Sequence, residues 1–192
     1  ECTGCPFLAY PVEDEKNFKE LKIRAIFDDV GVDFNSFKFQ MKTPSEAFGY
    51  RYYAKQVFGV VSGRVTLGSF IAGTHRLANN ENCPVLTDEL QGLLAQLLEL
   101  VRSRKMRVHR GNDAGLRFAV ARHSRSRGEL LLVVSTSDKN TASQLKELAK
   151  DLLEANSNLV SMTVLHNAAP GNSLLAGEEL FQVGKNSIAE SL

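Results

Sequence analysis

The chain has 192 residues, of which 43% are hydrophobic and 23% charged, and its net charge at neutral pH is +1. This length suits one domain with a sizeable core, and the composition is that of a globular protein rather than a disordered or fibrous one. Because the sequence contains no apolar run near the roughly 18 residues that a transmembrane helix needs, we expect no membrane association.

The first predicted element is a helix over residues 12–30. Its apolar side chains Phe18, Leu21 and Ile26 form only a narrow stripe, and Gly31 is a typical helix stop. Two strands follow, over residues 49–60 and 65–70. Ser62-Gly63 between them is a hairpin turn signal. A short third strand is expected after Gly73.

Thr87 has the character of an N-cap for a core-facing helix. The apolar residues that follow it have helical spacing, namely Leu90, Leu93, Leu94, Leu97, Leu98 and Val101. Strands are then predicted at 116–123 and 129–135.

The segment Thr141-x-x-Gln144 has the form of a capping box and predicts a further amphipathic helix. Strands are expected at 159–166, 173–177 and 179–183. Hairpin strands interrupted by two long amphipathic helices predict an α+β fold with a largely antiparallel sheet.

The charge is unevenly distributed along the chain. Residues 38–127 contain fifteen Lys or Arg against six Asp or Glu. The positive electrostatic field of such a basic excess attracts polyanions and suits contact with phosphates. The alternative is a solvated basic surface with no ligand.

The sequence offers no recognisable catalytic centre. It lacks the glycine-rich nucleotide loops, the GxSxG nucleophile motif and the HExxH zinc motif. The four histidines are scattered and no pair of carboxylates stands out for acid–base chemistry. We therefore assign no catalytic residue to this chain.

Three cysteines occur, as Cys2-x-x-Cys5 and a distant Cys83. An odd number, with one close pair, argues against a disulfide framework and for a reducing compartment, so we expect a cytoplasmic protein. The spacing is compatible with an iron–sulfur site, with half of a zinc site, or with unrelated thiols. A tetrahedral site needs four ligands, so a fourth is expected upstream of Cys2.

A family resemblance adds to this interpretation. Several motifs occur in the same order in the RNA uridine-C5 methyltransferases that carry a [4Fe–4S] cluster. The chain resembles that family in Cys2-Thr3-Gly4-Cys5-Pro6, in Phe48-Gly49-Tyr50-Arg51-Tyr52-Tyr53-Ala54-Lys55, in Ala72-Gly73-Thr74-His75, in Cys83-Pro84-Val85-Leu86 and in His166-Asn167-Ala168-Ala169-Pro170.

The resemblance implies that residues 1–192 are the central domain of such an enzyme. Cys2, Cys5 and Cys83 would be ligands of a [4Fe–4S] cluster. An RNA-binding barrel would precede the chain, and a catalytic domain that binds S-adenosylmethionine would follow Leu192. The helix 12–30 would pack on that catalytic domain, so we expect Phe18, Leu21 or Ile26 to be partly exposed in this chain. The substrate would be a uracil of 23S ribosomal RNA, or alternatively of transfer RNA.

We expect the RNA contacts to come from basic and aromatic residues of the strands. Arg51 and Lys55 are predicted on one strand face with Tyr53 between them, and such a face suits backbone contacts and base stacking. The predicted contact residues are Arg51, Tyr53, Lys55, His75, Arg122 and Arg125, and a basic cluster is expected around Arg104, Lys105, Arg107, Arg122, Arg125 and Arg127. The alternative is that Tyr53 packs in the core and Arg51 pairs with an acid.

Three functions therefore compete. The first is the central domain of an RNA uracil-C5 methyltransferase, a monomer that would be inactive by itself. The second is an RNA-binding module without methyltransferase activity. The third is a zinc-stabilised protein-interaction domain.

Overall fold

The structure is a computed structural model that describes residues 2–7, 9–43 and 46–191. The chain divides into two compact units. The smaller unit is Cys5–Ala47. The larger unit consists of the described residues of Glu1–Gly4 and Phe48–Leu192.

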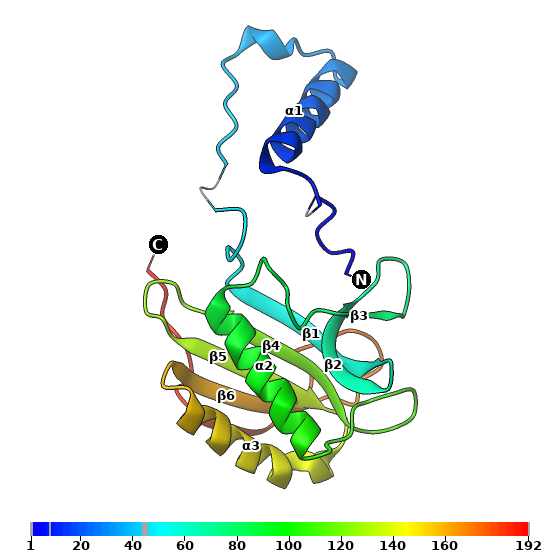
Figure 1. The fold of residues 1–192 in the computed structure, drawn as a ribbon, viewed down its shortest axis with the longest axis vertical. Helices are drawn as coiled ribbons and strands as arrows, with labels where there is room; N and C mark the ends of the chain where they lie inside the picture. The colour runs from blue at the N-terminus through cyan, green and yellow to red at the C-terminus, as the bar shows by residue number, and fades with distance from the viewer. Residues whose placement is uncertain (1, 8, 44–45, 192) are drawn as a thin grey trace. The chain divides into compact units, whose positions relative to one another are not determined.

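A single mixed sheet forms the frame of the larger unit (Figure 1). Within the described part of the chain its strand order is β3-β2-β1-β4-β5-β6-β7. Every neighbouring pair is antiparallel except β5 and β6. The predicted α+β class with a largely antiparallel sheet is confirmed. The strands are β1 (Tyr53–Val61), β2 (Arg64–Phe70), β3 (Leu77–Asn79), β4 (Leu116–His123), β5 (Leu130–Thr136), β6 (Leu159–His166) and β7 (Glu178–Gly184).

The β1–β2 hairpin forms where the turn signal predicts it. Ser62 and Gly63 have φ of 50° and 76°, the left-handed conformation that a two-residue hairpin loop of this kind requires. The turn sets the register, in which Val61 lies opposite Arg64 and Phe58 opposite Leu67. Both Phe58 and Leu67 consequently point into the core.

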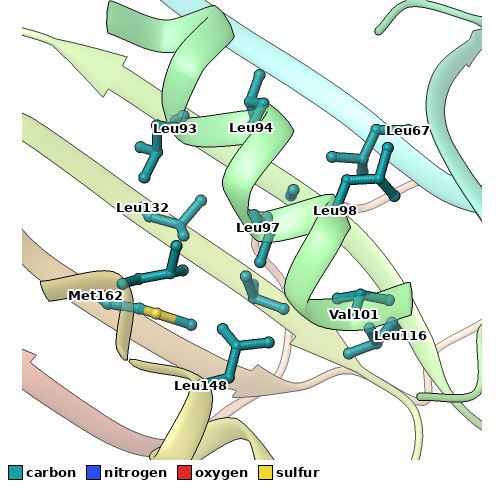
Figure 2. Packing of buried hydrophobic residues seen from close by; sticks show 14 of the residues in the cluster. Leu67, Leu93, Leu94, Leu97, Leu98, Val101, Leu116, Leu132, Leu148 and Met162 are labelled. Carbon is teal, nitrogen blue, oxygen red and sulfur yellow. The ribbon is translucent and has the colours of Figure 1, made fainter. Parts of the chain in front are cut away.

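Helices α2 (Asp88–Ser103) and α3 (Ala142–Ala155) pack on one face of the sheet (Figure 1). Thr87 is the N-cap of α2, as predicted, and its side chain accepts a hydrogen bond from Leu90 N. The predicted apolar stripe of α2 is buried against the sheet and α3. Figure 2 shows Leu97 of α2 in this core together with Leu132 and Met162 from the strands.

Helix α3 connects the parallel strands β5 and β6, as such a crossover requires. Thr141 is the N-cap residue of α3, as predicted, but its side chain makes no cap hydrogen bond. Thr141 ends a short 3₁₀ helix, Lys139–Thr141, and its hydroxyl donates to Asp138 O at 2.7 Å. Thr141 has helical φ and ψ of −77° and −7°, not the extended conformation from which an N-cap side chain accepts a bond, so the predicted capping box with Gln144 is wrong.

Two other predicted boundaries are corrected by tertiary pairing. Residues 49–52 do not belong to β1, because Arg51 forms an isolated bridge with Leu86 instead. Residues 173–177 are turns and bends, not a strand, and the last strand is β7 at Glu178–Gly184.

The smaller unit contains helix α1 (Val12–Asp29), which matches the predicted helix 12–30. All of its residues are described and none is buried. The predicted exposure of its stripe is confirmed, since Phe18 is 53% exposed, Leu21 66% and Ile26 54%. An apolar stripe of this kind marks a surface that suits a partner.

Candidate nucleic-acid interface

The alternating burial of β1 separates a core face from an open face. Ala54 and Phe58 are buried on the side of α2. Because side chains alternate along a strand, Tyr53 and Lys55 point to the opposite face. Tyr53 is half-buried and Lys55 is exposed. The prediction that Arg51, Tyr53 and Lys55 share a strand face is confirmed for Tyr53 and Lys55 and wrong for Arg51, which lies before β1.

The neighbouring strand β4 adds a third group to this face. Arg122 lies directly opposite Tyr53 in the antiparallel register. Its guanidinium carbon is 4.5 Å from the centre of the Tyr53 ring, and Lys55 Nζ is 5.1 Å from the same centre. Two cations thus contact one aromatic ring, an arrangement stabilised by the ring quadrupole.

Arg51 reaches the same surface from outside the strand. Arg51 N donates to Val85 O at 2.7 Å, and Arg51 O accepts from Thr87 N at 3.3 Å, so the loop before α2 holds its backbone. Its side chain is exposed and has no ion pair among the described residues. The alternative that Arg51 is neutralised by an acid is therefore not supported.

Arg51, Tyr53 and Arg122 line a hollow of about 450 Å³. We call it the Tyr53 hollow. Arg125, the other predicted residue of this end, lies with its guanidinium carbon 5.8 Å from the Tyr52 ring. The lining of the Tyr53 hollow consists of Tyr50, Arg51, Tyr52, Tyr53, Arg122, His123, Ile188 and Glu190.

His75 lies at a different place from the other predicted contacts. It is exposed in the turn after β2 and lines a second hollow of about 940 Å³. Arg76, His109 and Arg110 line the same hollow, together with Val57 of β1. We call this the His75 hollow. Both hollows border β1, so positive groups are available toward either end of its open face.

The predicted basic cluster of residues 104–127 is not one cluster. Thr87, at the start of α2, lies beside the end of β4, where its hydroxyl is 3.1 Å from His123 Nδ1. Arg104 caps the opposite end of α2, about 24 Å away for a helix of this length. Arg104 is also paired with Asp151, and Arg107 with Asp138 at 2.9 Å. Residues 104–107 are thus separate from Arg122, Arg125 and Arg127.

Arg117 is a basic residue that the sequence analysis did not single out. It is only 7% exposed, and burial lowers the pKa of its guanidinium. One terminal nitrogen donates to Asn167 O and Oδ1 at 2.8 Å and to Ala169 O at 2.7 Å, and the other donates to Gly171 O at 2.8 Å. Arg117 therefore holds the loop after β6, which borders the His75 hollow through Gly171 and Asn172.

The described cysteines are free thiols. Cys2 Sγ accepts from Gly4 N at 3.3 Å, and Thr3 Oγ1 accepts from Ala72 N at 3.2 Å, so residues 2–4 are held near the turn after β2. Backbone N–H groups that donate to sulfur are a usual feature of cluster-binding thiolates. Cys5 belongs to the smaller unit.

The loop that carries Cys83 is firmly anchored. Glu81 accepts from both terminal nitrogens of Arg102, at 2.7 and 3.2 Å, and from Thr66 Oγ1 at 2.8 Å. The Arg102 guanidinium, the main cause, holds the pKa of the Glu81 carboxyl below its usual value. Cys83 itself packs against the core. Among the described residues, however, no three His, Cys, Asp or Glu side chains form a group that could hold a metal ion.

Comparison with known proteins places this fold in context. No protein-family model matches the chain. An uncharacterized RNA methyltransferase of Synechocystis is 25% identical over 99% of the chain, and one of Streptococcus agalactiae is 28% identical over 72% of it. The chain is similar to RNA methyltransferases. It spans 42% and 32% of the length of these two relatives.

A solved structure shares the fold of the whole chain. This is the tRNA (uracil-54, C5)-methyltransferase of Pyrococcus abyssi in complex with S-adenosyl-L-homocysteine, with a TM-score of 0.73 and 19% identity. The match covers 100% of this chain and 43% of that protein. In the parts of the present chain that are described, no helix is long and apolar enough to cross a membrane.

Proposed function

We propose that this chain is the RNA-contacting part of an S-adenosylmethionine-dependent RNA uracil-C5 methyltransferase. The observation that carries the proposal is the open face of β1, where Tyr53 lies between Lys55 and Arg122 beside the Tyr53 hollow. An aromatic ring among cations suits single-stranded RNA, whose bases stack on aromatic rings and whose phosphates pair with the cations. Similarity to RNA methyltransferases over nearly the whole chain supports the same assignment.

The residues of this chain suit RNA binding and not catalysis. We assign RNA binding to Arg51, Tyr53, Lys55, Arg122 and Arg125 and no catalytic role to any of them. His75, in its own hollow, is proposed as a further RNA contact. The methyl donor and the catalytic groups would belong to a part of the protein outside residues 1–192. The exposed stripe of α1 is the surface that we propose packs against that part.

RNA binding is expected to depend on salt and on the cations of the open face. In a plot of log affinity against log salt concentration, each phosphate contact contributes about −0.7 to the slope for single strands. Lys55→Ala and Arg122→Ala should each weaken binding and reduce the slope by nearly one contact. The measurement is fluorescence anisotropy of a labelled uridine-containing oligonucleotide at several salt concentrations.

Lys150→Ala is the matched control, because it removes one exposed cation from α3 on the other face of the sheet. It should leave both affinity and slope unchanged. Salt-independent binding, or an equal loss of RNA affinity in Lys150→Ala, would contradict the proposal that the open face of β1 binds RNA. Competition by ribosomal and transfer RNA fragments would identify the preferred substrate; we propose ribosomal RNA.

The methyltransferase assignment itself has a direct test. Residues 1–192 should transfer no methyl group from labelled S-adenosylmethionine to RNA, and a protein that also contains the following domain should do so. Methylation by residues 1–192 alone would overturn this division. An inactive longer protein that still binds RNA would favour the alternative of an RNA-binding module.

We also propose that Cys2, Cys5 and Cys83 are ligands of a [4Fe–4S] cluster, with a fourth ligand supplied from outside the chain. The free thiols and the N–H···S bond to Cys2 fit thiolate ligation in kind. A bound cluster would fasten the N-terminal loop to the anchored Cys83 loop.

The test uses a longer protein that contains the segment before Cys2, because the fourth ligand is proposed to lie there. Iron is expected to bind this protein stoichiometrically on anaerobic reconstitution and to give broad visible absorption. Each of Cys2→Ser, Cys5→Ser and Cys83→Ser should lose most of that iron, while Ser69→Ala, in β2, should keep it. Iron retained in all three cysteine variants would contradict the ligand assignment. Zinc in place of iron would favour the zinc-stabilised alternative.

A further inference from the structure

The β4–β5 turn, residues 124–129, presents two consecutive backbone N–H groups to a single anion. Arg125 N donates to Glu190 Oε2 at 2.9 Å and Ser126 N donates to Glu190 Oε1 at 3.0 Å. Both oxygens of one carboxylate are therefore bound by adjacent amides. Successive amides that converge in a turn form an anion-binding concavity.

The segment that brings Glu190 to this turn is held by few other contacts among the described residues. Ser124 Oγ donates to Ala189 O at 2.7 Å, and Ser191 N donates to Ser126 Oγ at 2.9 Å. Ala189, Glu190 and Ser191 are all exposed. A short exposed segment of this kind can leave the turn without disturbing the core.

Three arginines lie at or beside the turn, while its own acid, Glu129, is paired with Lys185 and the nearby acids Asp88 and Glu89 line a separate hollow with Arg125. Arg122, Arg125 and Arg127 are exposed, and none of them has an ion pair within residues 46–191. Glu190 is the one acid among the lining residues of the Tyr53 hollow, all of which are described. A carboxylate bound by two adjacent amides beside these three arginines occupies a position that suits a phosphate.

We propose that the amides of Arg125 and Ser126 are a phosphate site for the RNA backbone, which the Glu190 carboxylate fills until RNA displaces it. The inference rests on the proposed RNA-binding function. Two non-bridging oxygens of a phosphodiester offer the same pair of acceptors as the carboxylate, and backbone N–H groups are common phosphate donors. Displacement exchanges one anion for another, so the donors stay satisfied.

The occupied state also predicts a cost in affinity. Glu190 competes with RNA for the turn. The apparent affinity for RNA is therefore reduced in proportion to the fraction of molecules in which the turn is free of Glu190. Its hydrogen bonds, chiefly from Ser126, lower its pKa to about 2. The carboxylate consequently remains charged at any pH suitable for RNA binding, and a substitution is the practical way to vacate the turn.

Glu190→Ala should open the site to a simple anion. In a titration with inorganic phosphate followed by ¹H–¹⁵N NMR, the amide signals of Arg125 and Ser126 should shift in the variant and stay unchanged in the original chain. RNA affinity should rise about tenfold, as expected for one additional charge-assisted contact. The salt slope should steepen by about 0.7.

Two further variants test whether the effect of Glu190 comes from its negative charge in general or from its position on the turn. Glu190→Gln should raise RNA affinity less than Glu190→Ala, because its amide still reaches the turn but binds more weakly than a carboxylate. Glu179→Gln removes an exposed acid of β7 and should change affinity little. An equal gain in Glu179→Gln would show a general charge effect and overturn the proposal.

The phosphate titration does not depend on RNA. If the original chain binds no RNA, the proposed function fails, and the titration of Glu190→Ala still decides whether the turn is an anion site. Absence of a phosphate-induced shift in Glu190→Ala would overturn the site. Weaker RNA binding in Glu190→Ala would also overturn it, since Glu190 would then support the turn rather than block it.

Discussion

Arg117→Met is expected to lower the free energy of unfolding by about 2–4 kcal/mol and to release the loop after β6. The guanidinium is buried and donates to carbonyl groups of Asn167, Ala169 and Gly171. Removing it leaves acceptors without donors, and each lost charge-assisted bond contributes roughly 1.5–3 kcal/mol before water partly replaces it. Urea unfolding measures the first effect, and limited proteolysis within residues 167–177 measures the second.

Arg117→Lys is the matched variant for this prediction. It keeps the positive charge but lacks the planar fork that reaches several carbonyls at once, so it should recover only part of the stability. Because Gly171 and Asn172 line the His75 hollow, RNA binding at that end should weaken in parallel. Wild-type stability and wild-type protease resistance in Arg117→Met would contradict the assigned role.

Leu97→Ala is expected to destabilise the larger unit by about 2–5 kcal/mol, the usual cost of a cavity at a fully buried leucine. Leu97 has no exposed surface and lies in the core between α2 and the sheet (Figure 2). Calorimetry or urea unfolding gives the change directly. Leu175→Ala is the control: Leu175 is 55% exposed, so its truncation should stay within about 0.5 kcal/mol. Equal effects of the two substitutions would contradict the core assignment.

Elements whose signals are local were predictable. Helix α2 follows from the leucine spacing and the Thr87 cap, and strands β4 and β6 occupy residues 116–123 and 159–166, as expected. The helical spacing of apolar residues and the presence of an N-cap residue are patterns within a short stretch of sequence, so they can be recognised without the tertiary structure. The predicted capping box failed because Thr141 ends a 3₁₀ helix and has helical φ and ψ, which the local motif does not show.

The candidate interface was only partly predictable. Tyr53 and Lys55 share a face because the strand period is two, which the sequence shows. The approach of Arg122 to Tyr53 depends on the β1–β4 register, which joins residues 69 positions apart, and no local pattern specifies it. The basic residues 104–127 look like one cluster in the sequence, but the length of α2 and the pairing of Arg104 and Arg107 with acids separate them.

The sequence alone determined the α+β class, the two core-facing helices and the excess of basic residues in 38–127, because these follow from local periodicity and composition. The exposure of the α1 stripe was expected from the family resemblance, not from periodicity. Only the tertiary structure decided that Arg117 is buried on the carbonyls of a distant loop and that Glu190 occupies the amides of Arg125 and Ser126. Both contacts join residues about 50 to 65 positions apart. The sequence does not show whether a charged side chain is exposed to solvent or hydrogen-bonded to a distant backbone group.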